Sequence, residues 1–123
     1  MRKKVGLFSE NVVQKLGLEM AVGTPIYVAD TNVEHMQKSH PEDYEKFGNE
    51  LHNIIANPDY VGKNEKDDSI EFVKEYLVCG KYVKVAVRVS SRNVYYVRSM
   101  YALNPNRVKN FIKKGTLKKL DKK

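Results

Sequence analysis

The sequence predicts an α+β domain in which N-terminal helices pack on one face of an antiparallel sheet of about four strands, followed by a C-terminal helix. Three observations favour this class. Apolar residues recur with helical spacing in the first half of the chain, three strand-like runs follow in the second half, and one of these runs alternates strictly between valines and other residues. A length of 123 residues and a hydrophobic content of 41% fit one domain, residues 1–123.

The first thirty residues contain three short predicted elements. Residues 4–8 are typical of a short strand, and Ser9 is suited to cap a small helix that ends near Gly17. After a turn at residues 23–25, residues 26–28 resemble a second short strand.

Two histidines lie where one predicted helix meets the next. Thr31-x-x-Glu34 has the spacing of a capping box, which places His35 in the first turn of a helix. Because Pro41 is tolerated only near a helix start, a second helix begins there and His40 lies at the corner between the two.

The clearest predicted helix extends from Pro41 to Ala56, because its apolar residues form a stripe while its acidic residues stay in solvent. The stripe consists of Tyr44, Phe47, Leu51, Ile54 and Ile55. Residues 57–59, Asn-Pro-Asp, end this helix.

Strands and a last helix occupy the remainder of the chain. Runs rich in Val, Tyr and Phe predict strands at residues 70–77, 82–89 and 94–103. Asn104-Pro105 is a helix start, and Gly115 is positioned to end that helix. The lysine-rich tail at residues 113–123 fits a solvated surface or a nucleic-acid contact, and its removal after Gly115 is expected to spare the fold.

Strand register decides which side chains share the functional face of the sheet. The valines at positions 83, 85, 87 and 89 form the core face. If Val89 pairs with Tyr95 through a bulged or odd-length turn, the valines are accompanied by Val97, Ser99 and Tyr101. The opposite face then carries Lys84, Ala86, Arg88, Tyr96, Arg98 and Met100. A shift by one residue would bury Arg98 among valines, at a cost of several kcal/mol.

Charge is divided unevenly along the chain. Residues 1–80 hold 9 Lys and Arg against 14 Asp and Glu, net −5, whereas residues 81–123 hold 13 Lys and Arg against Asp121, net +12. A polyanion would therefore bind the second half.

Several classes of chemistry and location are disfavoured. Cys79 is the sole cysteine, which excludes an internal disulfide and a cysteine zinc cluster. The three histidines lack the i, i+4 zinc spacing, so we expect no metal and no other cofactor. No glycine-rich phosphate loop occurs, and no segment has the length of a signal peptide core or a membrane span, so a cytoplasmic protein is expected.

The remaining polar residues supply the parts for RNA cleavage without a metal. His35 and His40 can act as acid and base near neutral pH. Arg88 and Arg98 can hold phosphate on a face that also carries Lys84. Ser99 and Tyr101 can donate hydrogen bonds to phosphate, and Tyr96 can stack on a base.

Each of these residues also has a structural interpretation. His35 fits a solvated helix residue, His40 a corner histidine bonded to backbone, and His52 a neighbour of the apolar stripe. Arg88 fits a strand arginine paired with Glu71 or Glu75, and the strand tyrosines and Ser99 fit ordinary sheet positions.

The order of several short motifs resembles a known nuclease superfamily. His-x4-His is followed by Ile-Ile-x-Asn-Pro-Asp-Tyr-Val-Gly, Ser-Ile-Glu-Phe-Val-Lys, Val-Lys-Val-Ala-Val-Arg and Val-Arg-Ser-Met-Tyr. This order is similar to the phage- and mobile-element-associated branch of the barnase–EndoU–colicin–RelE-like nucleases. The resemblance covers a core at residues 31–120, after an N-terminal extension at residues 1–30. It implies a four-stranded sheet whose exposed face cleaves RNA without metal, and it marks His35, His40, Lys74, Arg88, Arg98, Ser99 and Tyr101.

We therefore predict a metal-independent, toxin-like endoribonuclease that cleaves transfer RNA or another structured RNA through attack of the 2′-hydroxyl. Its expected partners are RNA and an antitoxin or immunity protein. His35, His40, Arg88, Arg98, Ser99 and Tyr101 are the predicted catalytic residues, and Lys74, Lys84 and Tyr96 the predicted substrate-binding residues. The alternatives are a non-catalytic RNA-binding domain that uses the same basic face, and a protein-interaction domain that uses the acidic helix.

Overall fold

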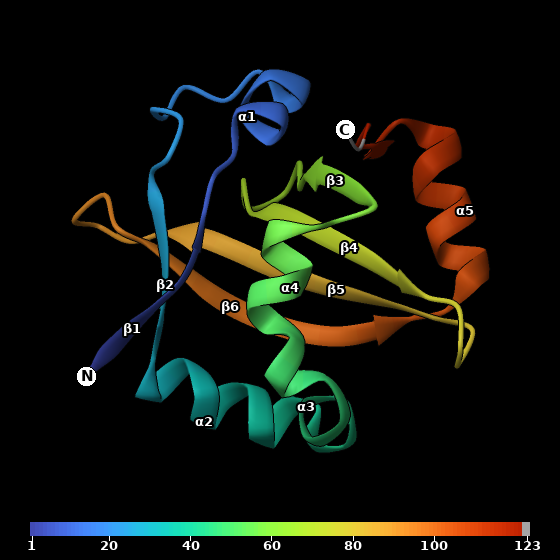
Figure 1. Cartoon of the computed structure of the whole chain (residues 1–123), viewed down its shortest axis with the longest axis horizontal. Helices are drawn as coiled ribbons and strands as arrows, with labels where there is room; N and C mark the ends of the chain where they lie inside the picture. Colours follow the sequence, from blue (N-terminus) through green and yellow to red (C-terminus); the bar gives the residue numbers. More distant parts are fainter. Residues whose placement is uncertain (122–123) are drawn as a thin grey trace.

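Seven strands form one mixed sheet in the order β1-β2-β6-β5-β4-β3-β7 (Figure 1). The computed structural model describes residues 1–121. The strands are β1 Arg2–Leu7, β2 Pro25–Ala29, β3 Tyr60–Lys63, β4 Ile70–Tyr76, β5 Lys81–Val89, β6 Tyr95–Leu103 and β7 Leu117–Lys119. The helices are α1 Glu10–Leu16, α2 Asp30–Ser39, α3 Pro41–Phe47, the 3₁₀ turn Gly48–Glu50, α4 Leu51–Ala56 and α5 Pro105–Lys114.

The α+β class is confirmed, and most strand pairs are antiparallel as predicted, but the sheet is mixed and has seven strands instead of about four. The early strands β1 and β2 join the sheet, and β2 runs parallel to β6 through the pairs Ile26–Tyr95 and Tyr27–Tyr96. Strands β3 and β7 were not predicted, because four and three residues are too few to display an alternating pattern. Both depend on tertiary pairing, which local composition does not reveal.

The predicted helix from Pro41 to Ala56 is broken into α3 and α4 by the 3₁₀ turn at Gly48. Glycine is a poor helix former, and the Tyr44 ring packs so closely that a Cβ at residue 48 would lie 3.1 Å from it. The preceding helix, α2, starts one residue before Thr31, and the Asn32 side chain accepts a hydrogen bond from the Ala29 backbone N–H. The predicted corner at His40 is confirmed.

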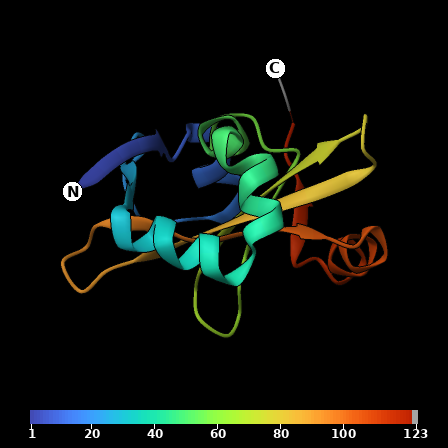
Figure 2. The ribbon, with the colours of Figure 1, turned by 90° about the horizontal axis from the view of Figure 1, so that it is seen from below.

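The N-terminal helices lie on one face of the sheet, as predicted, and the C-terminal helix α5 covers part of the other face. The larger core cluster lies between the sheet and α1 to α4 and includes Phe8, Ile54, Phe72 and Val85, each 0% exposed. The smaller cluster lies under α5 on the other face and includes Val73, Leu103, Val108 and Leu117. Figure 2 shows α5 and the loop between β3 and β4 on the side of the sheet opposite α4. Within residues 1–121, no helix is long and apolar enough to cross a membrane.

The end of the chain belongs to the fold and is not a dispensable tail. Leu117 and Leu120 are 2% and 8% exposed, and Leu117 pairs with Gly62 of β3. A Cβ at Gly62 would overlap the carbonyl oxygen of Thr116, so the two segments are tightly packed. The last two residues of the lysine-rich tail lie outside the described part of the chain.

Candidate active site

The side chains of β5 alternate between a buried apolar face of the sheet and a polar face. Val83, Val85 and Val87 are fully buried beneath the helices, as predicted. The intervening side chains of Lys84 and Arg88 therefore lie on the opposite face. We call the surface that carries these two residues, together with the residues paired beside them on β6, the open face.

The hairpin between β5 and β6 has the predicted register near its turn. Val89 pairs with Tyr95, and Arg88 pairs with Tyr96. Arg98 is exposed and lines one cleft with Arg88 and Tyr96, which confirms that Arg88 and Arg98 share a face.

A β-bulge at Arg98 changes the register further along the strand. Past this extra residue, Ser99 and Tyr101 pair with Ala86 and Lys84 on the open face, whereas Met100 is fully buried. The prediction that Ser99 and Tyr101 accompany the valines, and that Met100 lies on the open face, is therefore wrong. The bulge gathers more polar groups on the open face than the regular register would.

The outer edge of β6 is covered by strand β2 first and by helix α3 afterwards. Strand β2 pairs with β6 at Tyr95 and Tyr96, close to the hairpin turn. Further along, the Asp43 carboxylate of α3 accepts a hydrogen bond from the Ala102 backbone N–H at 3.0 Å. This bond holds the start of α3 against the sheet.

His40 is brought onto the open face by this arrangement. Its ring stacks on Tyr101 with centroids 4.7 Å apart and planes inclined by 25°. Its backbone N–H donates to Met36, and its carbonyl accepts from Tyr44, so the corner is fixed on both sides. The side chain is half-buried, which leaves it accessible to a ligand.

Lys84 and Glu71 form a buried ion pair next to Tyr101. Lys84 Nζ lies 3.0 Å from Glu71 Oε2, and their side chains are 10% and 7% exposed. The Asn64 amide also donates to Glu71, at 3.4 Å. Burial alone would lower the pKa of Lys84, but the hydrogen bond with Tyr101 and the charge of Glu71 outweigh it and raise that pKa. Lys84 is therefore a fixed cation on the open face.

Arg88 and Arg98 line a cleft of about 280 Å³ with Tyr96, Thr31 and other residues of the β5–β6 turn and α2. Within residues 1–121, neither guanidinium forms an ion pair. Two unpaired arginines in one cleft repel each other, and such a surface favours an anion.

The loop between β3 and β4 lies over the same face. Hydrogen bonds from Ser69 lower the pKa of Asp67, and the nearby charges of Arg88 and Lys84 lower it further. This loop therefore borders the open face.

His35 lies on the rim of the open face. It is exposed on α2, and its Nε2 is 3.4 Å from Ser39 Oγ. Thr31, one turn earlier on the same stripe of the helix, lines the arginine cleft. His40 follows at the end of α2, so His35 lies between the arginine cleft and the Tyr101 stack.

Lys74 is not brought together with the other predicted site residues. It pairs with Val83 and shares the helix-covered face with Phe72. Its ammonium group donates a hydrogen bond to the backbone carbonyl of Asn57, 3.0 Å away, and Asn57 is the C-cap of α4. This contact is a helix C-terminal interaction on the side away from Arg88.

A comparison with known families identifies the chain. The model of the family described as phage-Barnase-EndoU-ColicinE5/D-RelE like nuclease3 matches residues 3–110, from β1 into α5. The chain belongs to this nuclease family. No curated protein and no solved structure is significantly similar to it. The match begins in β1, within the segment predicted as an N-terminal extension.

For this nuclease-family member, the sequence suggested Glu71 as a partner of Arg88, whereas Glu71 pairs with Lys84, and the contribution of α5 was not predicted. Glu71, Lys84 and Tyr101 line a cleft of about 460 Å³ whose far wall includes Arg107 and Phe111 of α5. Side chains alternate along β4, so Glu71 lies on the open face and Phe72 on the helix-covered face. This alternation is the sequence signal that could have revealed a carboxylate on the open face. Placing α5 beside the sheet requires the tertiary structure.

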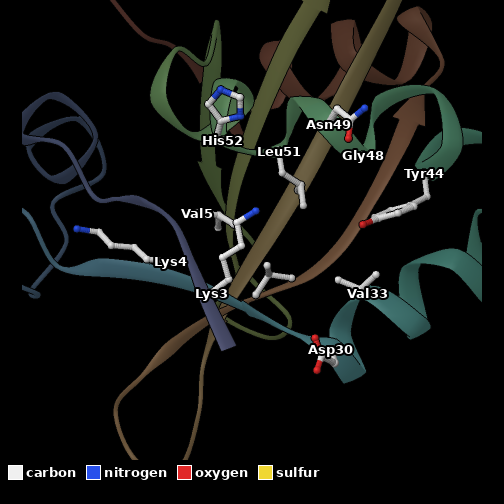
Figure 3. Close-up of a pocket in the computed structure, with 11 residues that line it drawn as sticks. Lys3, Lys4, Val5, Asp30, Val33, Tyr44, Gly48, Asn49, Leu51 and His52 are labelled. Carbon is white, nitrogen blue, oxygen red and sulfur yellow. The ribbon is translucent and has the colours of Figure 1, made fainter. Parts of the chain in front are cut away.

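A separate cavity of about 380 Å³ lies on the helix-covered side of the sheet (Figure 3). Its apolar lining includes Val5, Val28, Val33 and Leu51. Lys3 of β1 and His52 of α4 contribute polar groups to it, and none of the predicted site residues lines it. Across residues 1–121, His, Cys, Asp and Glu side chains do not gather in a group of three that could hold a metal ion.

Proposed function

We propose that this chain is an endoribonuclease that cleaves RNA through attack of the 2′-hydroxyl on the adjacent phosphate, without a metal ion. One observation carries the proposal: the imidazole ring of His40, a group that can donate or accept a proton, is stacked on Tyr101 beside the buried cation of Lys84. The same face presents Arg88 and Arg98 in a cleft that suits an anion. Membership in a nuclease family supports the class of reaction.

His35 and His40 are the proposed proton-transfer pair. One histidine removes the proton of the 2′-hydroxyl as the bond from that oxygen to phosphorus forms. The bond from phosphorus to the 5′-oxygen breaks, and the other histidine protonates the departing oxygen. The products are a 2′,3′-cyclic phosphate and a 5′-hydroxyl. His35 lies on α2 five residues before His40, which corresponds to a rise of about 7.5 Å along the helix axis.

The other residues of the open face stabilise charge. Arg88 and Arg98 hold the phosphate, because each guanidinium group is planar and presents several N–H donors. Lys84 and the hydroxyls of Ser99 and Tyr101 face the charge that develops on the pentacoordinate phosphorus. Because Lys84 is already oriented by Glu71, it does not have to reorganise during the reaction.

The biological role that fits best is a toxin-like cytoplasmic enzyme. The family description connects phage proteins with nucleases of the colicin and RelE types. The substrate would be transfer RNA or another structured RNA, and an antitoxin or immunity protein would cover the open face.

Incubation of purified protein with total RNA in EDTA tests the proposal. We expect fragments that end in 2′,3′-cyclic phosphate, and His40→Ala should lower the cleavage rate by about 10²–10⁴-fold while RNA binding is nearly unchanged. His52→Ala is the matched control, because His52 is exposed on the helix-covered side. Tight binding of RNA that stays intact would instead establish the non-catalytic RNA-binding alternative.

A further inference from the structure

A cluster on the open face borders the arginine cleft through Tyr96, and its Arg2 and Tyr27 are not used by the proposed reaction. It lies where β1 and β2 join the sheet. The Arg2 guanidinium carbon is 4.3 Å from the centre of the Tyr27 ring, and Arg2 Nη1 donates to Tyr96 Oη at 3.4 Å. Tyr27 and Tyr96 are neighbours on β2 and β6, with ring centroids 6.3 Å apart.

Arg2 is held in place although it is exposed. An arginine on the surface of an edge strand ordinarily samples many rotamers, and ordering it on binding costs conformational entropy. Here the guanidinium lies on one tyrosine and is bonded to the hydroxyl of another. A cation oriented in this way binds an anion at a smaller entropic cost.

Strand pairing connects this cluster to the arginine cleft. Tyr27 pairs with Tyr96, and Tyr96 pairs with Arg88, so the three residues form one row across β2, β6 and β5. Neighbouring strands lie about 4.8 Å apart, which separates the Tyr27 position from Arg88 by roughly 10 Å. At this separation, Arg2 and Arg88 can contact successive phosphates of one RNA strand.

We propose that Arg2, Tyr27 and Tyr96 form a second nucleotide subsite for single-stranded RNA. Arg2 binds a phosphate beyond the scissile one, and the tyrosine rings contact the adjoining base. This inference rests on the proposed function, because it takes the scissile phosphate to lie at Arg88 and Arg98. It makes the paired strands β1 and β2 part of the substrate-binding surface.

The test measures binding of a fluorescent six-nucleotide 2′-O-methyl RNA, which has no free 2′-hydroxyl and is not cleaved by the proposed reaction. Arg2→Ala should weaken binding about tenfold. The slope of log affinity against log salt should fall by about 0.7, as expected for one lost phosphate contact on a single strand. The matched control is Lys3→Ala, because Lys3 carries the same charge on the next residue but pairs with Val28 and contributes to the cavity on the other side (Figure 3).

Lys3→Ala should change affinity less than twofold and leave the salt slope unchanged. Equal losses in the two variants would show a general charge effect and overturn the subsite. An unchanged slope in Arg2→Ala would also overturn it. Failure of the proposed function has a different signature, since total RNA would then yield no cyclic-phosphate ends, whatever the difference in binding between the two variants.

Discussion

Separating Lys84 from Glu71 should destabilise the fold more than removing both charges together. Their charged atoms lie 3.0 Å apart, and the side chains are only 10% and 7% exposed. Breaking a buried pair by removing one partner typically costs about 3–5 kcal/mol, whereas replacing both partners by apolar residues of similar size is often neutral. We therefore expect Lys84→Met to lower the free energy of unfolding by about 3 kcal/mol or more, and the double variant with Glu71→Leu to recover most of that loss.

The two single variants should differ, because their remaining partners differ. Without Lys84, Glu71 retains only the longer 3.4 Å hydrogen bond from Asn64 among the partners found in residues 1–121. Without Glu71, Lys84 retains Tyr101 and has a flexible stem that can carry its ammonium towards solvent. Glu71→Leu should therefore cost less than Lys84→Met.

Urea unfolding followed by far-UV circular dichroism measures these free energies, since the chain contains no Trp. Lys81→Met is the matched control, because Lys81 is at the start of the same strand and outside the pair. Single variants within about 1 kcal/mol of the wild type, or a coupling energy near zero, would refute the assignment. The double variant should fold but cleave RNA poorly, because the cation beside Tyr101 is gone.

The same pair predicts how stability changes at alkaline pH. In the folded state, burial by itself lowers the pKa of Lys84. The hydrogen bond with Tyr101 and the charge of Glu71 outweigh burial, so the pKa is raised overall. Its contribution is therefore complete below the pKa of an unfolded lysine, about 10.4, and is lost as pH rises through the folded value. Above about pH 10, the wild type should lose stability more steeply with pH than the double variant.

Three further outcomes are expected. The cleavage rate should show a bell-shaped pH profile, and a profile that is unchanged in His40→Ala would remove that histidine from proton transfer. Arg88→Ala should raise KM and lower kcat in steady-state kinetics, because it contacts the phosphate in both the ground state and the transition state. Truncation after Gly115 should lower the melting temperature by roughly 10–20 °C, because burial of Leu117 and Leu120 is worth about 1.5–3 kcal/mol each. An unchanged melting temperature in the truncated chain would contradict the assignment of β7 to the sheet.

Local patterns predicted the elements that have a local cause. The valine alternation in β5 indicated its buried face, and the cost of burying Arg98 gave the correct pairing of Val89 with Tyr95. The proline after His40 gave the helix corner. In each case a few neighbouring residues determine the structure, so the sequence is sufficient.

The rest of the site depends on contacts between distant segments. The bulge at Arg98 has no marker such as glycine, and it reverses the faces assigned to Ser99, Met100 and Tyr101. The stack of His40 on Tyr101 joins residues 61 positions apart. Neither feature follows from periodicity, because both require knowing which strand edge the helix corner covers.

Charge along the sequence indicated the second half as the binding surface, but chemistry on RNA requires more than positive charge. A uniformly basic face would hold RNA without transferring a proton. His40 and the carboxylate of Glu71, which orients Lys84, both come from the acidic half of the chain. They reach the open face for two separate reasons. Strand pairing brings β4 beside β5, and α3 covers the part of the β6 edge beyond its pairing with β2. In the proposed reaction, the fold thus supplies His40 as an acid–base group and Glu71 as the counter-charge of Lys84, on a surface that would otherwise only bind RNA.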